Sequence, residues 1–137
     1  MNYLNGEPFP EKDASLMNVL QIAYIGDTVW ELIVRNYLIR KKLNVHHMHS
    51  ECISYVSARA QASFMQMILP ELNSGECDLA KRGRNAHSRH PVPKNQSPED
   101  YAMATAVEAL IGYLYLTGKT ERIEHLANII FGGMNRG

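Results

Sequence analysis

The sequence predicts an all-α fold in a single domain. Two observations support this prediction. Apolar residues recur at intervals of three and four over most of the 137 residues, which is the period of an amphipathic helix. No stretch shows the strict alternation of apolar and polar residues that is typical of a half-buried strand. A chain of this length can bury a sizeable core and leaves no room for a second domain, so we expect residues 1–137 to form one unit.

The beginning of the chain predicts an irregular arm followed by a long helix. Residues 1–13 contain two prolines and several polar residues, so we expect no regular structure there. Apolar residues then recur at helical spacing over 16–38 and cover more than one face of the predicted helix. Asp13 or Ser15 is the expected N-cap. Basic residues accumulate over 40–42, where the helix is expected to end.

The remaining sequence predicts four further helices. Apolar spacing predicts a helix over 50–69, which Pro70 ends. A shorter helix is expected from its cap Ser74 through Asn85, before a basic loop over 86–96. The last two are a helix from the cap Ser97 and Pro98 through 116, and a helix over 121–131, capped by Thr120 and stopped by Gly132-Gly133.

Histidine and cysteine residues do not predict a transition-metal site. His46, His47 and His49 fall in one short predicted loop, where three ligands can hardly converge without a carboxylate or cysteine partner. Cys52 and Cys77 have no partner at metal-ligand spacing, so we expect reduced thiols. The sequence also lacks a signal peptide and an uninterrupted apolar span of about 18 residues. We therefore expect a cytoplasmic protein with no membrane partner.

Charge is balanced overall but unevenly distributed. The net charge is zero, which argues against a strongly basic, non-specific nucleic-acid binder. Residues 79–98, however, contain five lysines and arginines and no acid. Such a cluster is either a solvated face or a surface that contacts phosphate.

Two lone acids lie in the middle of the two most apolar helices. Asp27 follows Gly26 in the first long helix, and Glu108 lies in the helix that Pro98 begins. A buried carboxylate is costly unless it is paired, hydrogen-bonded or bound to a cation. Either each acid has a structural partner, such as Arg35 for Asp27, or the two acids meet around a hard cation such as Mg²⁺, which prefers carboxylate oxygens.

Five sequence strings resemble, in the same order, those of the ribonuclease III catalytic domain. The match is closest to the short bacterial branch of that family, mini-ribonuclease III, and extends over roughly residues 16–118. The strings are YIGDTVWELIVRNYL (24–38), YVSARAQA (55–62), KRGRNAHS (81–88), PKN (93–95) and AVEALIGYLYLTG (106–118).

The resemblance implies a homodimeric ribonuclease III fold and Mg²⁺-dependent endonucleolytic hydrolysis of double-stranded RNA that leaves 5′-phosphate ends. It implies that Asp27 and Glu108 are catalytic metal ligands. Asp100, two turns before Glu108, is a candidate outer ligand if the helix is regular between them. The expected substrate is the precursor of large-subunit (23S) ribosomal RNA, with a ribosomal protein as helper. The candidate RNA-binding residues are Arg82, Arg84, Asn85, Lys94, Asn95 and, with an ion pair as the equal alternative, Arg59.

Two positions depart from the standard ribonuclease III pattern. Standard domains have a glutamate one turn before the aspartate and an aspartate three residues before the later glutamate, where this chain has Ala23 and Thr105. The short branch is reduced in the same way, so Asp100, Glu31 or water would complete the metal shell. Two other functions stay open: a catalytically inactive RNA-binding domain of the same fold, and a helical protein-interaction module in which both acids are structural.

Overall fold

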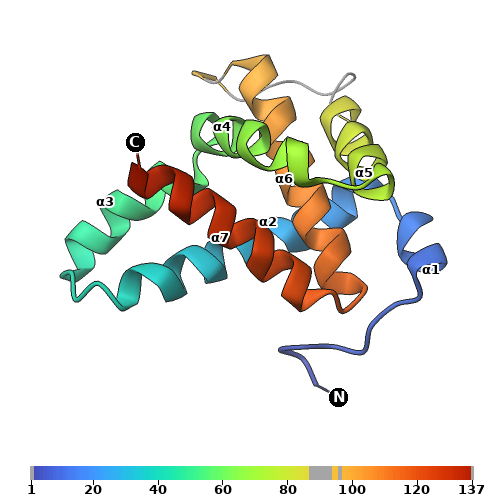
Figure 1. Ribbon diagram of the computed structural model, residues 1–137, viewed down its shortest axis with the longest axis horizontal. Coiled ribbons are helices and arrows are strands. Elements are labelled where there is room, and N and C mark those ends of the chain that lie inside the picture. The colour runs from blue at the N-terminus through green and yellow to red at the C-terminus, as the bar shows by residue number, and fades with distance from the viewer. Residues whose placement is uncertain (1, 87–93, 96, 137) are drawn as a thin grey trace.

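The structure is a computed structural model that describes residues 2–86, 94–95 and 97–136. Over these residues it contains helices and turns but no strand, which confirms the predicted all-α fold (Figure 1). No helix in the described part of the chain is long and apolar enough to cross a membrane. The helices are α1 (Glu11–Ser15), α2 (Val19–Ile39), α3 (Val45–Val56), α4 (Ala58–Ile68), the 3₁₀ turn η1 (Leu69–Glu71), α5 (Ser74–Asn85), α6 (Pro98–Leu116) and α7 (Thr120–Arg136).

Helices α2 and α6 form the centre of the fold and cross in close contact at two glycines. A Cβ on Gly26 of α2 would lie 1.7 Å from the carbonyl oxygen of Glu108. A Cβ on Gly112 of α6 would lie 2.0 Å from the carbonyl oxygen of Ile22. Because neither gap admits a side chain, only glycine lets the two backbones approach this closely. The crossing places Asp27, the neighbour of Gly26, beside α6.

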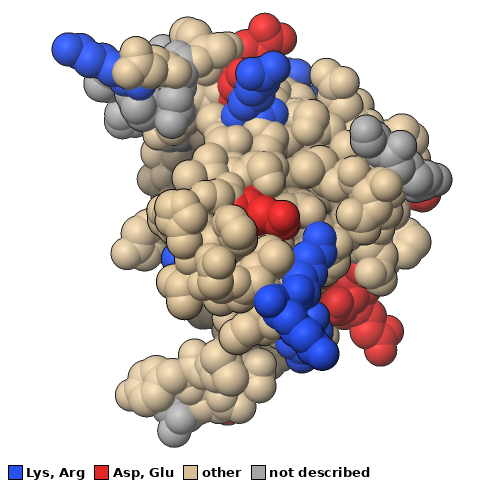
Figure 2. Space-filling model, turned by 90° about the vertical axis from the view of Figure 1, so that its left-hand side faces the viewer, with Lys and Arg blue, Asp and Glu red and all other residues tan. Residues whose placement is uncertain are grey.

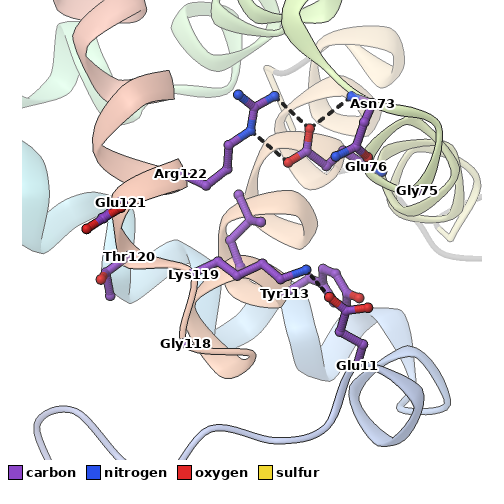
Figure 3. A pocket seen from close by; sticks show the side chains of 11 residues that line it. Glu11, Asn73, Gly75, Glu76, Tyr113, Gly118, Lys119, Thr120, Glu121 and Arg122 are labelled. Atoms are coloured by element: carbon purple, nitrogen blue, oxygen red, sulfur yellow. Dashed lines mark hydrogen bonds and ion pairs between the residues drawn. The ribbon is translucent and has the colours of Figure 1, made fainter.

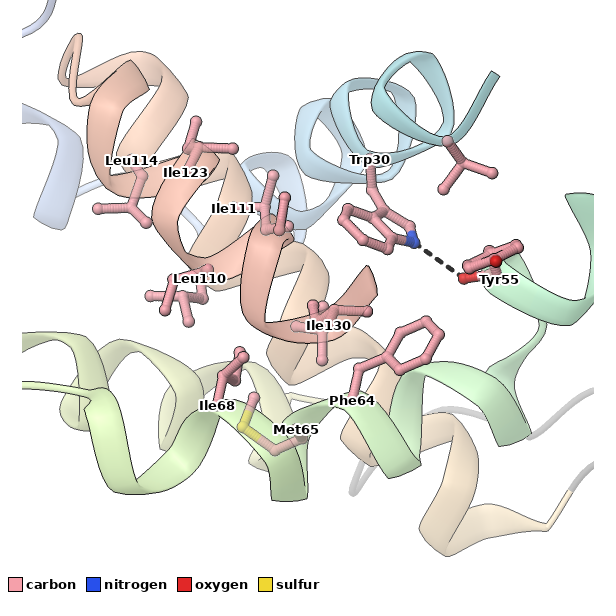
Figure 4. Close-up of a cluster of buried hydrophobic side chains, with 14 of the residues drawn as sticks. Trp30, Tyr55, Phe64, Met65, Ile68, Leu110, Ile111, Leu114, Ile123 and Ile130 are labelled. Atoms are coloured by element: carbon pink, nitrogen blue, oxygen red, sulfur yellow. Dashed lines mark hydrogen bonds between the residues drawn. The ribbon is translucent and has the colours of Figure 1, made fainter. Parts of the chain in front are cut away.

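An aromatic and aliphatic core joins α2 to α3, α4 and α7 (Figure 4). Trp30 of α2 is fully buried and donates its Nε1–H to the carbonyl oxygen of Tyr55 at 2.9 Å. The Trp30 ring also lies edge-on to Phe64, with centroids 5.9 Å apart. Phe131 of α7 stacks on Tyr37 with a centroid separation of 4.1 Å. These contacts fix the orientation of α2, and with it the side of α2 on which Asp27 lies.

A cavity of about 660 Å³ lies between the beginning of α5, the end of α6 and the beginning of α7 (Figure 3). Two ion pairs line it. The buried carboxylate of Glu76 accepts hydrogen bonds from Nε and Nη2 of Arg122 at 2.9 and 2.8 Å, and Lys119 pairs with Glu11. Neither Asp27 nor Glu108 lines the cavity. Its ion pairs tie α5 to α7 and α1 to the α6–α7 turn.

Several helix boundaries near the N-caps differ from the predicted ones. Helix α1 begins inside the segment 1–13 that was expected to be irregular. The N-cap of α2 is Asn18, whose side chain accepts a hydrogen bond from the backbone N–H of Leu20 at 2.9 Å, in place of either predicted cap. Asn73, not Ser74, caps α5. At α2 and α5 an asparagine close by has the extended backbone that a cap requires, which apolar periodicity does not reveal. Helix α1 begins after Pro10 without a side-chain cap.

The predicted helix over 50–69 is interrupted at Ser57. The backbone of Ser57 is extended, with ψ 154°, and its hydroxyl accepts the N–H of Ala60 to begin α4. The three histidines predicted in a loop lie instead in α3, which begins directly after its cap Asn44. Helix α7 continues through the two glycines predicted to stop it, and Met134 beyond them packs against the core. Core packing there outweighs the cost of glycine in a helix, about 1 kcal/mol each.

Candidate active site

Asp27 and Glu108 meet where α2 crosses α6. Their carboxyl groups lie within hydrogen-bonding reach of each other. Asp27 is exposed to solvent, whereas Glu108 is half-buried. The close approach at Gly26 produces this meeting, because it brings the turn of α2 that carries Asp27 against the backbone of Glu108 itself.

The surroundings of Glu108 raise its pKa to about 8. Burial of the carboxyl group is the largest cause, followed by the negative charge of Asp27 and a hydrogen bond with its carboxyl group. The amide of Gln61 acts in the opposite direction. At neutral pH and without a cation, the Glu108 carboxyl group is therefore mostly protonated. A divalent cation can replace that proton because it neutralises both carboxylates.

Gln61 of α4 belongs to the same site, although it was not among the predicted site residues. Only 2% of its surface is exposed, and its Nε2 donates to the carbonyl oxygen of Val56 at 3.0 Å. Its Oε1 has no hydrogen-bond donor among the described residues. An unsatisfied buried oxygen costs about 1–3 kcal/mol. The available signals were its place in the family-like string YVSARAQA and on the apolar side of the helix, and these do not separate a functional amide from a structural one.

These groups fit a magnesium ion. Both acids and the unpaired Gln61 oxygen are hard oxygen donors, and Mg²⁺ is bound through one or two carboxylates while it keeps several waters. Within the described ranges, no group of three or more His, Cys, Asp or Glu side chains is placed to hold a metal. The protein thus offers two carboxylates, and water would complete the coordination shell.

Comparison with known proteins identifies the family. The sequence pattern of the ribonuclease III domain matches residues 20–119, which include both acids. The chain belongs to the ribonuclease III family. Members of this family are endoribonucleases that act on double-stranded RNA, so the prediction of an endoribonuclease is confirmed.

Individual relatives and a solved structure agree with this assignment. The chain is 42% identical over 130 residues to mini-ribonuclease 3 of Clostridium tetani, covering 93% of this chain and 85% of the relative. It is 44% identical over 121 residues to mini-ribonuclease 3 of Brevibacillus brevis, covering 88% and 90%. A crystal structure of a Fusobacterium nucleatum protein matches with a TM-score of 0.81 and 30% identity over 89% of this chain and 98% of that one. These matches confirm the resemblance to the mini-ribonuclease III branch.

The two positions that depart from the standard ribonuclease III pattern are buried. Ala23 is 6% exposed and belongs to the core. Thr105 is 3% exposed, and its hydroxyl donates to the carbonyl oxygen of Tyr101 one turn earlier in α6, at 3.0 Å. Because neither alanine nor threonine carries a negative charge, neither residue can take the place of the carboxylate that standard ribonuclease III domains have at its position.

Two other acids were considered as members of the metal shell. Asp100 lies in the first turn of α6, about 12 Å from Glu108 along the helix axis, so the two cannot hold one ion directly. That Asp100 acts as an outer ligand of the metal, through a bound water, stays a prediction. Glu31 faces Arg35, with 3.7 Å between Oε1 and Nη2. Arg35, the structural partner considered for Asp27, is thus placed beside a different acid.

Most of the predicted RNA-binding residues are exposed. Arg84 and Asn85 lie at the C-terminal end of α5, and Lys94 and Asn95 lie further along the connection to α6. Arg59 is exposed in the first turn of α4. Residues 87–93 and 96 of the predicted basic loop lie outside the described part of the structure.

Arg82 makes a contact that the sequence did not predict. Its guanidinium group donates to the carbonyl oxygens of Ser15 and Met17, at 2.9 and 3.0 Å. These bonds join α5 to the turn between α1 and α2. The cluster of basic residues over 79–98 does not indicate these hydrogen bonds, because both partners of Arg82 lie more than sixty positions away in the chain.

Proposed function

We propose that the chain is a magnesium-dependent enzyme that cleaves double-stranded RNA as a homodimer in the cytoplasm. The observation that carries the proposal is the meeting of Asp27 and Glu108 at the α2–α6 crossing, in a chain of the ribonuclease III family. The substrate we propose is the 23S ribosomal RNA precursor, with a ribosomal protein as helper, as the mini-ribonuclease III resemblance implies. The free thiols of Cys52 and Cys77 are compatible with a reducing compartment.

The residues of the site have distinct tasks in this reaction. Asp27 and Glu108 would hold the cation. Gly26 and Gly112 keep the two carboxylates at a fixed separation, because they keep the helix backbones in contact. When bound, magnesium lowers the pKa of a water that attacks phosphorus and stabilises charge on the leaving 3′-oxygen. The products have 5′-phosphate and 3′-hydroxyl ends.

We propose that the RNA backbone lies over the exposed polar residues of α4, α5 and the connection to α6. Arginine forks bind phosphate oxygens in pairs, and amides reach 2′-hydroxyl groups. Arg82 supports this surface by anchoring α5, because its guanidinium group is already engaged with two backbone carbonyls. The proposed contacts are Arg59, Arg84, Asn85, Lys94 and Asn95.

Exposed apolar side chains on α2 and α3 support the proposal of a homodimer. Tyr24 and Leu32 of α2 are 82% and 57% exposed, and Val45 and Ile53 of α3 are 77% and 53% exposed. Figure 2 shows the side of the molecule where α3 lies, and uncharged surface separates its small groups of charged residues. A second copy would cover such surface and give two active sites. Light scattering at micromolar concentration should give twice the chain mass of 15.5 kDa, and a monomer would count against the dimer.

The experiment that tests the enzymatic proposal is cleavage of a labelled long RNA duplex, with Mg²⁺ and with chelator. Asp27→Asn should abolish metal-dependent cutting. The control Glu124→Gln, which changes an exposed acid on α7, should cut as the wild type does. Retention of the duplex without cutting by the wild type would indicate an inactive RNA-binding domain, the alternative that Ala23 and Thr105 motivate. Neither cutting nor retention would favour a protein-interaction module.

A further inference from the structure

The proposed reaction leaves the buried amide of Gln61 without a task. Gln61 lies on α4, which packs against α6, the helix that carries Glu108. The bond from its Nε2 to the carbonyl oxygen of Val56, at 3.0 Å, fixes the orientation of the planar amide. Nε2 has a second hydrogen, and the amide also acts as a hydrogen-bonding partner of the Glu108 carboxyl group. Oε1 is left unpaired in a side chain that is 2% exposed.

A purely structural role does not account for an amide at this position. The bond to Val56 stabilises the break between α3 and α4, but it uses only the nitrogen side of the amide. A methionine would fill a similar buried space without an unpaired oxygen, because its side chain is apolar and flexible. The unpaired oxygen is explained if it acts on a group that binds at the two acids.

We propose that Gln61 is a positioning residue of the magnesium site, an inference that rests on the proposed function. Its Nε2, held by Val56, orients the Glu108 carboxylate by hydrogen bonding. Its Oε1 accepts a hydrogen bond from a water that accompanies the hydrated cation. Carboxylate ligands of metals are commonly fixed by such hydrogen-bonding partners, and loss of one typically reduces metal affinity or activity about 10–100-fold.

The test uses Gln61→Met, which removes the amide and keeps the length of the side chain, and Gln61→Glu, which adds a third carboxylate. Gln66→Met is the matched control, because Gln66 is an exposed glutamine on the same helix. Magnesium is titrated into each protein while the melting temperature is followed, and duplex cleavage is measured over the same range of magnesium concentration. The thermal titration reports on metal binding without any need for turnover.

Gln61→Met should need about tenfold more magnesium for half-maximal cleavage and show a smaller magnesium-induced rise in melting temperature. Its KM for RNA should stay within about twofold of the wild type, and kcat should fall at limiting magnesium. Gln61→Glu should melt lower than the wild type in chelator and gain more from added magnesium, because three acids repel one another until a cation binds.

The outcomes separate the inference from the proposed function. A wild type that cuts in magnesium, together with Gln61 variants whose magnesium titrations match the wild type, would overturn the role of Gln61 alone, even if the variants were less stable. A wild type that neither cuts nor responds to magnesium would overturn both. An altered titration in both Gln61 variants, with Gln66→Met unchanged, is the supporting result.

Discussion

Substitution of Gly26 by alanine should separate the two helices that carry the catalytic acids. The added Cβ would lie 1.7 Å from the carbonyl oxygen of Glu108 and 2.8 Å from the backbone nitrogen of Gly112, whereas real Cβ contacts are essentially never shorter than 3.0 Å. The helices must therefore separate locally by more than 1 Å. Overpacking of this kind costs about 1–3 kcal/mol, and the upper end applies because both obstacles are backbone atoms. Alanine has a higher helix propensity than glycine, and this offsets about 0.5–1 kcal/mol of the overpacking cost.

The expected net loss of about 2 kcal/mol corresponds to a melting temperature lower by roughly 6–10 °C. Cleavage should fall about 100-fold, because a displacement of about 1 Å at a catalytic group has effects of that size. The assays are thermal unfolding and duplex cleavage well below the melting temperature. The matched control is Gly75→Ala, where the nearest atom to the new Cβ is 3.5 Å away, so its stability and activity should be unchanged or slightly higher. A Gly26→Ala protein as stable and active as the wild type would refute the reasoning.

Three further predictions concern charge. In chelator, the wild type should lose stability as pH rises from about 4.5 to about 8, because the raised pKa of Glu108 means that the folded state binds more protons than the unfolded state in this range. Thermal unfolding of Glu108→Gln should not show this loss. At Glu76, burial raises the pKa, but hydrogen bonds from Arg122 and from the Asn73 backbone outweigh it and leave the pKa lowered from 4.5. The ion pair therefore stabilises the protein above pH 4.5 and loses its effect as pH falls through the lowered pKa. In urea unfolding, Glu76→Gln should cost about 2–4 kcal/mol at pH 7 and progressively less as pH falls below 4.5, and a cost that does not change with pH would contradict this. Arg84→Ala should weaken duplex binding alike for all sequences and reduce the slope of log affinity against log salt by about one, as filter binding would measure.

Helical periodicity was sufficient to predict the fold class and the approximate place of the long helices. It did not predict the break at Ser57, because the apolar stripe continues from α3 into α4 and only the extended backbone of one residue separates them. Caps were misplaced where two polar neighbours competed, as at Asn73 and Ser74. In each of these cases two local conformations differ little in free energy. Tertiary packing then decides which one the chain adopts.

The meeting of Asp27 and Glu108 was predictable only in part. Two lone acids in apolar helices made a shared cation one of two explanations, and the family resemblance favoured it. The sequence showed Gly26 and Gly112, but not that each glycine faces the backbone of the other helix. Gln61 lies in the family-like string YVSARAQA but was assigned no role, because one polar residue in an amphipathic helix has no distinctive spacing. Long-range contacts of this kind depend on how helices cross, which residue patterns leave undetermined.

Calorimetric titration of magnesium into the wild type, Asp27→Asn, Glu108→Gln and the double variant tests most directly whether the two acids hold one ion together. The account predicts that either single substitution removes binding as completely as the double substitution, because the acids act as a unit. Binding by Asp27→Asn or Glu108→Gln with the affinity of the wild type would contradict it.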